Sequence, residues 1–249
     1  AQRTHIPDTD KGHSQRIQPT DTDNGHDSRF TTYGFKVAAY DKTKDLIIDP
    51  LLASTYLGGG QEDVPNCITL DNDGNIYVAG WTGLGFPATS DAYDTSNNSG
   101  YGSEDSFVAK LSGDLTQLLA ATYLGGSSIE FITSIVIDKE KNVFVSGYTG
   151  NGSPEFPTTE GAFDTSWNGG RYTLYNGFIS KFNGDLTQLL ASTYLGGSGY
   201  DGDFIRSMAI DQNGNIYVTG DTDSRDFPIS SSAYETSLNS RECFISKLN

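Results

Sequence analysis

The side chains best suited to metal chemistry lie in residues 1–29. An Asp-x-Asp-x-Gly-His unit occurs there twice, and carboxylates two residues apart before a glycine are typical of loops that wrap oxygen ligands around calcium. The histidines could instead bind a transition metal across a subunit contact, since neutral imidazole suits Zn, Cu or Fe. No bidentate glutamate closes either loop, so a solvated tail without a cofactor is the alternative. The candidate ligands are Asp8, Asp10, His13, Asp21, Asp23 and His26.

The rest of the chain offers few groups for catalysis. All three histidines, His5, His13 and His26, precede residue 30, so a Ser-His-Asp or Cys-His arrangement cannot be built within residues 30–249. A three-histidine zinc site is excluded there for the same reason. Carboxylate pairs for glycoside hydrolysis stay open, because such a pair is defined by its separation in space. We therefore expect a protein that is not an enzyme, with an extracellular hydrolase as a distant alternative.

The net charge limits the partners. The 249 residues include 16 Lys and Arg against 32 Asp and Glu, which gives a formal net charge of -16. Such a surface repels phosphate backbones, so nucleic acid and anionic membranes are poor partners, whereas divalent cations are plausible ones. No apolar run is long enough to insert into a membrane. The chain begins at Ala1 without Met or an apolar leader, as expected for an exported, processed protein or for a trimmed one.

The secondary structure that must position these side chains is predicted from an internal sequence repeat. Thr-Tyr-Leu-Gly-Gly begins at Thr55, Thr122 and Thr193, at intervals of about 70 residues. Each copy continues with an Asp-turn-Asn-aromatic-Val hairpin, a Phe-Pro pair and a closing Phe-x-x-Lys strand. The signals are for strands throughout, and four short strands per repeat with Gly and Pro between them predict one propeller blade per repeat. The fold class is therefore all-β, with three four-stranded blades.

The repeated aromatic residues are expected to fill the core, since each buried ring contributes roughly 1.5 to 3 kcal/mol. They are Tyr56, Tyr77, Phe86, Phe107 and their equivalents in the other copies. The hairpin turns after Asp71 and Asp211 look like calcium loops, but the second copy reads Lys139-Glu-Lys141 at the same place. Hairpin turn chemistry explains all three copies, so we assign these turns to structure.

These motifs resemble a known family, the bacterial secreted β-propeller repeats called SBBP repeats. The family's units look like Ser-Thr-Tyr-Leu-Gly-Gly, an Asp-x-x-Gly-Asn-Ile-Tyr-Val hairpin, Asp-Phe-Pro and Phe-Val-Ala-Lys-Leu, and the resemblance covers about residues 46–249. The second copy departs at its turn, which has no glycine. The resemblance implies an exported or cell-surface location and no particular activity.

The organisation predicted from these patterns has three parts. Residues 1–29 form a polar tail, residues 30–50 a β-hairpin with a spare strand, and residues 51–249 the three-repeat array. The array is permuted, because it begins with a fourth-strand sequence at Leu46–Leu57 and stops after the third strand Phe244–Leu248. The last blade therefore lacks a strand that the other end of the array carries.

The permutation predicts self-association. Three blades are too few to close a propeller, which typically has four to eight, and an unpaired edge strand is a template for another chain. We expect the spare strand of one subunit to complete the last blade of another, giving a six-bladed ring of two chains or a filament. A fragment of a longer propeller or an open three-blade arc is the alternative. The residues are Leu46, Ile47, Ile48 and Leu52 on the spare strand, and Phe244, Ile245 and Leu248 on the last blade.

A ligand surface is predicted where the copies differ most. The longest variable loop carries Trp167, Arg171, Tyr172 and Tyr175, groups suited to stacking on sugar rings or to a protein interface, or else to filling space between blades. The thiols of Cys67 and Cys243 are either idle or joined in a disulfide between the first and last repeats. The sequence thus predicts an extracellular or cell-surface structural protein that forms a homo-oligomer, or alternatively a glycan- or protein-binding adhesion module.

Overall fold

The computed structural model describes residues 52–99, 104–150, 155–168 and 175–249. The chain divides into two compact units, Ala1–Leu52 and Ala53–Asn249, and the second holds every strand of the described residues. The predicted tail, the predicted hairpin at 30–50 and the candidate metal ligands lie outside the described residues. The strands are β1 (Asp63–Leu70), β2 (Ile76–Thr82), β3 (Asp105–Leu111), β4 (Leu118–Leu124), β5 (Glu130–Ile137), β6 (Val143–Gly150), β7 (Tyr175–Phe182), β8 (Leu189–Leu195), β9 (Asp203–Ile210), β10 (Ile216–Thr222) and β11 (Glu242–Leu248).

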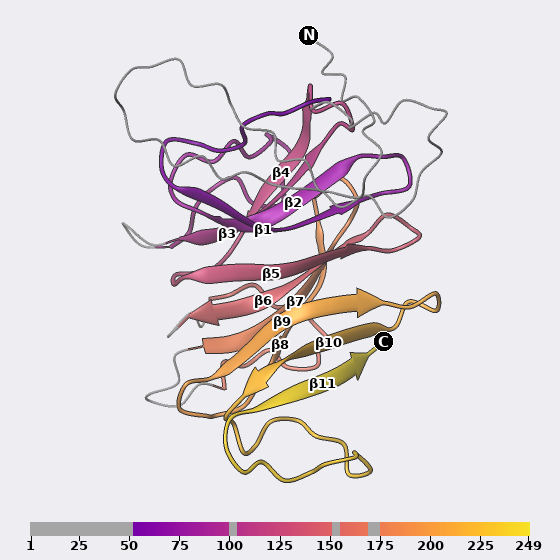
Figure 1. Cartoon of the computed structure of the whole chain (residues 1–249). Helices are drawn as coiled ribbons and strands as arrows, with labels where there is room; N and C mark the ends of the chain where they lie inside the picture. The colour runs from indigo at the N-terminus through magenta and orange to yellow at the C-terminus, as the bar shows by residue number, and fades with distance from the viewer. Residues whose placement is uncertain (1–51, 100–103, 151–154, 169–174) are drawn as a thin grey trace, which may run out of the picture. The chain divides into compact units, whose positions relative to one another are not determined.

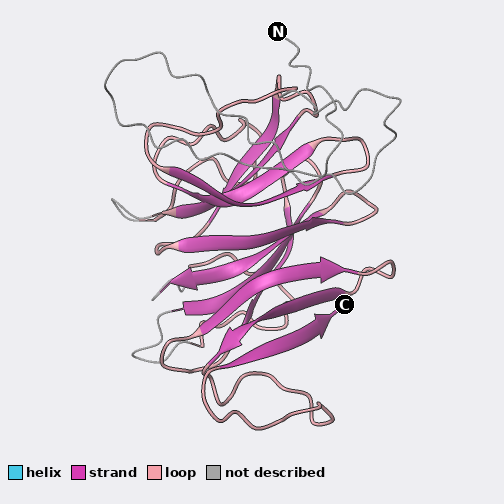
Figure 2. Cartoon of the chain, in the orientation of Figure 1, coloured by secondary structure: helices cyan, strands magenta, loops and turns pink. Residues whose placement is uncertain are grey.

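The strands form three antiparallel sheets, here called blades 1, 2 and 3, which follow one another in chain order (Figure 1). Their strand orders are β1-β2-β3-β4, β5-β6-β7-β8 and β9-β10-β11, so each blade is a simple meander. Figure 2 shows strands and loops but no helix in the part of the chain that is described. The predicted all-β fold with three propeller-type blades is confirmed, and among the described residues the third blade has three strands, as the permuted sequence predicted.

The Thr-Tyr-Leu-Gly-Gly motif supplies the fourth strand of a blade. The copy at Thr122 lies in β4 and the copy at Thr193 lies in β8, the outer strands of blades 1 and 2. Each of these strands is bonded on both sides, because a loop segment accepts and donates main-chain hydrogen bonds along the edge that faces away from the sheet. In blade 1 the loop bonds are Thr89 N–H to Ala121 O and Tyr123 N–H to Asp94 O, 2.9 and 3.0 Å.

Apolar contacts join each blade to the next. One buried cluster lies between blades 1 and 2 and another between blades 2 and 3. The inner strand of a following blade, β5 or β9, packs against the preceding sheet. Members of the first cluster include Tyr77, Val108, Ile135 and Tyr194, and members of the second include Ile179, Ile205 and Met208. Each blade therefore needs a neighbour on both faces to bury its apolar side chains.

The expectation that every repeated aromatic residue is buried is wrong for Tyr56 and for Tyr217, the equivalent of Tyr77 in the third copy. Tyr77, Phe86 and Phe107 are buried, as is Tyr123, which has the same place as Tyr56 in the next copy. Tyr56 itself is fully exposed, because residues 52–59 belong to no strand in the described structure. The sequence that builds a fourth strand twice therefore has no sheet to join at its first occurrence.

The hairpin turns have the structural role predicted for them. Asp71 Oδ1 accepts hydrogen bonds from the N–H groups of Asp73 and Asn75, both at 2.9 Å, and its Oδ2 accepts one from the Asn75 side chain at 2.8 Å. The third turn residue is left-handed in all three blades. Its φ is 82° at Gly74, 86° at Gly214 and 69° at Lys141. The second copy thus keeps the turn geometry without the glycine that suits it.

We predict that Lys141→Gly stabilises the protein by about 1 kcal/mol, since a side chain in the left-handed region costs roughly that amount. The ion pair between Lys141 and Asp73 joins exposed groups, so its loss has little effect. Urea unfolding of both proteins measures the change. The matched control is Gly74→Ala, where an added methyl group meets no atom within 4 Å and should destabilise for the backbone reason alone. A lower unfolding midpoint for Lys141→Gly would contradict the prediction.

Candidate functional site

The outward face of blade 3 is uncovered. Tyr217 and Ile245 occupy the positions that Tyr77 and Val108 occupy in blade 1. In blade 1 both are covered by blade 2 and fully buried, whereas 79% of Ile245 and 36% of Tyr217 are exposed. An apolar face that is built to be covered therefore ends the array at this side.

The opposite end of the array has the complementary face. Ile68 on β1 is 68% exposed, and Leu70 beside it is also exposed. The residues at the position of Ile68 in the other blades are Ile135 and Met208, which are 5% and 6% exposed because the preceding blade covers them. The first blade thus presents the surface that blades 2 and 3 use to bind the blade before them.

The edge strand β11 lacks a neighbour on one side. Among the described residues it pairs only with β10, whereas β3 and β7 each pair with a fourth strand. In those blades a phenylalanine lies opposite the motif tyrosine, as Phe107 does to Tyr123 and Phe178 to Tyr194. Phe244 has the same place on β11, with no tyrosine opposite it in the described chain.

The loop that would cover a fourth strand is present in blade 3. Ser230 and Glu235 correspond to Thr89 and Asp94, and the Ala233 N–H donates to Ser230 O at 3.0 Å, as Ala92 does to Thr89. In the described residues, Ser230 and Glu235 make none of the main-chain bonds by which Thr89 and Asp94 hold β4. A strand position therefore lies open between this loop and β11.

The structure places the predicted strand-complementation residues as follows. Ile245 is exposed, Phe244 is buried in the core shared with blade 2, and Leu248 packs against that core. Leu52 is exposed, and Leu46, Ile47 and Ile48 lie outside the described residues. All of residues 52–58 are described, and none of them belongs to a strand.

A row of polar side chains crosses all three blades at the strand ends where β1, β5 and β9 begin. We call it the boundary row. Strand register places one acid, one threonine and one acid or amide side by side in each blade. The threonine of blade 1 donates to its acid at 2.5 Å, and that of blade 2 does so at 2.7 Å. The members are Asp63, Thr82 and Asp105, then Glu130, Thr149 and Asn176, then Asp203, Thr222 and Glu242.

Two carboxyl groups of this row meet at the boundary between blades 1 and 2. Asp105 and Glu130 are both fully buried and both point at Gly125, where an added methyl group would lie 2.5 Å from Asp105 Oδ1 and 2.7 Å from Glu130 Oε2. Burial raises the pKa of Asp105 to about 6, although the Asn98 N–H bonds its Oδ2 at 2.6 Å. Because two ionised carboxylates have no hydrogen to share, a hydrogen bond between Asp105 and Glu130 needs one of the two to be protonated.

The boundary between blades 2 and 3 has the same arrangement with an amide in one place. Asn176 replaces the aspartate, and a methyl group added at Gly196 would lie 2.2 Å from Asn176 Oδ1 and 2.6 Å from Asp203 Oδ2. Burial raises the pKa of Asp203 as well. Because the pair of carboxyl groups at the first boundary is sealed from solvent, it offers no access to the substrate of a glycosidase.

The predicted loop residues separate in the structure. Trp167 packs against the core beside Tyr194, with ring centroids 6.0 Å apart, while Arg171 and Tyr172 lie outside the described residues. Tyr175 joins a line of half-buried rings in which each contacts the next at centroid distances between 4.9 and 6.1 Å. This aromatic line consists of Trp81, Phe131, Tyr148, Tyr175 and Phe204, with Arg206 and Arg241 over Phe204.

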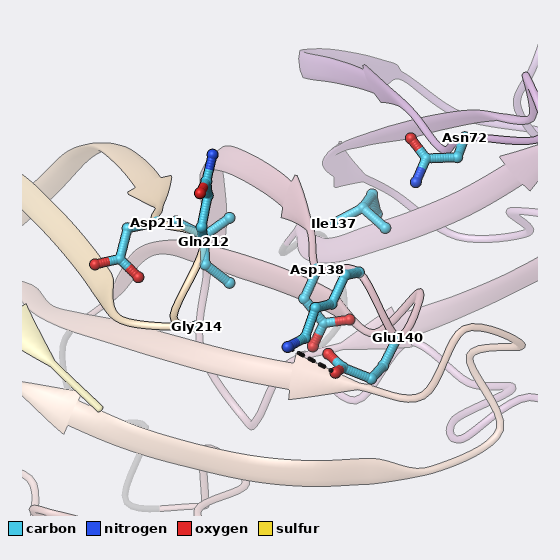
Figure 3. Close-up of a pocket in the computed structure, with 9 residues that line it drawn as sticks. Asn72, Ile137, Asp138, Glu140, Asp211, Gln212 and Gly214 are labelled. Atoms are coloured by element: carbon cyan, nitrogen blue, oxygen red, sulfur yellow. Dashed lines mark ion pairs between the residues drawn. The ribbon is translucent and has the colours of Figure 1, made fainter.

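The hairpin turns surround a cavity of about 340 Å³ (Figure 3). It lies at the ends of the inner strands that are farther from the boundary row. Carboxylates line it, but Asp211 is occupied by its own turn and Glu140 forms an ion pair with Lys139 at 3.6 Å. Within the described residues no three His, Cys, Asp or Glu side chains are placed to hold a metal ion. Both carboxylates, Asp211 and Glu140, are therefore engaged within the fold.

The two cysteines are separate free thiols. Cys67 packs at the boundary of blades 1 and 2, where burial raises its pKa to about 12, and Cys243 is exposed on β11. Within one chain they form no disulfide, since Cys67 lies on β1 of blade 1 and Cys243 on β11 of blade 3. No helix in the described residues could span a membrane.

The three repeats match a known protein family. A family model described as a beta-propeller repeat, SBBP, matches residues 54–87, 121–153 and 192–228. The chain belongs to this family and carries three of its repeats, as the sequence motifs predicted. No curated protein matches the chain.

The carboxyl pair predicts a pH-dependent stability that Asp105→Asn should remove. A carboxyl whose pKa is raised by folding stabilises the protein below its unfolded pKa and loses this effect as pH rises through about 6. Relative to wild type, we expect Asp105→Asn to be more stable at pH 8 by on the order of 2 kcal/mol, and little different at pH 4. Urea unfolding at the two pH values measures this.

The matched variant is Asn176→Asp, which places a second carboxyl pair at the other boundary. It should lose stability as pH rises, in the reverse sense to Asp105→Asn. Equal pH profiles for all three proteins would show that the boundary pair does not share a proton.

Proposed function

We propose that this protein is a non-enzymatic structural subunit, extracellular or on the cell surface, that associates with copies of itself end to end. Residues 52–58 of one copy add to β11 of another as its fourth strand. The first blade of the donor then covers the third blade of the acceptor. The observation that carries the proposal is the repeat itself: the same segment fills the same position in blades 1 and 2, and its first occurrence is unpaired.

The contacts at the internal boundaries support this geometry. Added strands gain main-chain hydrogen bonds along an edge, while side chains at alternate positions give specificity. Tyr56 would lie opposite Phe244, as Tyr123 lies opposite Phe107, and Ile68 would face Tyr217 and Ile245. These side chains are exposed in the single chain, so their burial would favour association by a few kcal/mol each at most.

The two contacting surfaces differ, which makes the interface head to tail. Such an interface closes into a ring or continues as a filament, according to the rotation that it imposes. Two copies would bring together six blades, a number at which propellers close. The SBBP repeat is typically associated with secreted proteins, and this supports the proposed location.

The first test compares two tyrosines of identical motif. Tyr123→Ala removes a buried ring and should lower the free energy of unfolding by about 3 kcal/mol or more. Tyr56→Ala should leave the unfolding of the single chain unchanged and weaken association at least tenfold, because its ring becomes buried only in the assembly. Sedimentation velocity over a concentration series, with urea unfolding, separates the two effects. A monomeric wild-type chain at all concentrations up to about 100 μM would refute self-association.

The second test uses the fact that a head-to-tail interface joins two different surfaces. Ile68→Asp damages the first-blade surface and Ile245→Asp damages the third-blade surface, so each variant alone should stay monomeric. Mixed together they retain one intact pair of surfaces and should form a complex of two chains and no larger species. Association of either variant alone, or no complex on mixing, would contradict a head-to-tail interface.

A second function, binding of glycans, is favoured by the aromatic line. Tyr175, the first residue of β7, contacts Tyr148 and Phe204, so the line extends over blades 2 and 3 and reaches Trp81 in blade 1. Half-buried rings with arginines beside them suit stacking on sugar rings. With this line as its binding surface, the protein would be an adhesion module, the alternative to a purely structural role.

Affinity electrophoresis in gels that contain a neutral β-glucan or a xylan tests the glycan function. Wild type should be retarded, and Trp81→Ala should migrate as in a gel without polysaccharide while keeping its melting temperature. Phe163→Ala is the control, because Phe163 is an exposed aromatic residue outside the line. Equal mobility of wild type and Trp81→Ala in every gel would exclude this role for the line.

A further inference from the structure

We propose that the association of two copies takes up a proton, because Glu242 of one copy and Asp63 of the next meet as a carboxyl pair equivalent to Asp105 and Glu130. The inference rests on the proposed end-to-end association. It adds a regulatory property to that interface: the subunits bind each other more tightly in acid.

We call the contact between blade 3 of one copy and blade 1 of the next the joint. Its first-blade half is already formed in the single chain. The Gly59 N–H donates to Asp63 Oδ2 at 2.7 Å, as the Gly197 N–H donates to Asp203 Oδ2 at 2.7 Å. A methyl group added at Gly58 would lie 2.2 Å from Asp63 Oδ2, so the aspartate points at this glycine as Asp203 points at Gly196. The segment that connects the first motif copy to β1 therefore has the geometry seen at an internal blade boundary, although it joins no preceding blade in the single chain.

Leu57 shows the same preformed arrangement. The leucines of the second and third motif copies, Leu124 and Leu195, lie in buried clusters that include residues of the following blade. Leu57 packs in the same way against the buried cluster of blade 1, whereas Tyr56 beside it is exposed. The segment is therefore seated on its own blade and open toward a preceding one.

The third-blade half of the joint is Glu242. Strand register places it beside Thr222, as Asp105 lies beside Thr82. Its carboxylate accepts only long hydrogen bonds from Asn239, at 3.4 and 3.5 Å. In blades 1 and 2 the equivalent side chains are fully buried by the inner strand of the next blade, while Glu242 is partly exposed.

The groups around the two acids supply no opposing charge. Beside Glu242, Arg241 forms ion pairs with Asp221 and Asp201, and Asp203 is the nearest acid of its row. Around Asp63 are the Thr82 hydroxyl, the Gly59 N–H and the exposed Glu62. Within the described residues, no Lys or Arg forms an ion pair with Asp63 or Glu242.

The chemistry of the joint follows from burial. Two carboxylates brought face to face and removed from water cannot both stay ionised, so one proton binds the pair. At the internal boundary, burial raises the pKa of Asp105 to about 6. Association should therefore be strong below the pKa of the assembled pair and weaken as pH rises through about 6.

Sedimentation velocity of the full chain at about pH 5 and about pH 7.5 tests the inference against Glu242→Gln. For wild type we expect the dissociation constant of each joint to rise about tenfold from the lower to the higher pH. In Glu242→Gln an amide replaces one acid, as Asn176 does at the second internal boundary, so the dissociation constant should rise less steeply with pH than that of wild type and be lower than that of wild type at pH 7.5. The charge control is Glu160→Gln, an exposed side chain of blade 2, which should keep the pH dependence of wild type.

The outcomes separate the two proposals. The histidines of residues 1–29 are common to all three proteins, so only a difference between Glu242→Gln and the others supports the pair. Association with the same pH profile in all three refutes the carboxyl pair and leaves end-to-end assembly intact. Association that strengthens with added calcium rather than acid, and is lost with EDTA, shows a cation in place of the proton. A monomer at every pH overturns both proposals.

Discussion

The structure depends on one constraint: a four-stranded blade can bury neither its edge nor its faces alone. The outer strand of each complete blade comes from the start of the next repeat, so Thr122 and Thr193 belong to one unit in sequence and to the preceding blade in space. This overlap ties consecutive blades by backbone pairing as well as by apolar contact. It also means that an array of such units has an unpaired strand at one end and an open edge at the other. The association proposed above would cover both ends with further copies of the chain.

Most of the fold could be predicted from the sequence, because the signals for it are local. Alternating apolar residues marked the strands, and Asp, Asn and Gly marked the turns; even the turn without glycine was assigned correctly, since Lys141 takes the conformation of Gly74. Tyr56 was assigned wrongly to the core. Its motif has the same letters as the buried copies, and burial depends on a partner strand that no local pattern reports.

The boundary row was missed for a different reason. Asp105 and Glu130 lie on different blades, and nothing near either residue in the sequence reveals the other. A signal did exist: an acid follows the Gly-Gly of every copy, at Asp63, Glu130 and Asp203, although surface acids are common in a chain of net charge -16. Glu130 and Asp203 are buried because the side chains of adjacent blades meet there, which no local pattern reveals. The aromatic line was missed similarly, because its rings come from positions that are not aromatic in every copy.

A buried carboxyl pair inside a blade array has different consequences from the same pair between copies. Between blades 1 and 2 the chain is continuous, so an unfavourable pair lowers the stability of the fold but cannot separate blades held at high effective concentration. Between two copies no such connection acts, and the same free energy is subtracted directly from association. The amide at Asn176 shows that the boundary tolerates an uncharged partner, so a carboxyl at Glu242 is not demanded by packing. In the proposed assembly, a carboxyl at this one place would therefore make the joint between molecules more sensitive to pH than the molecules themselves.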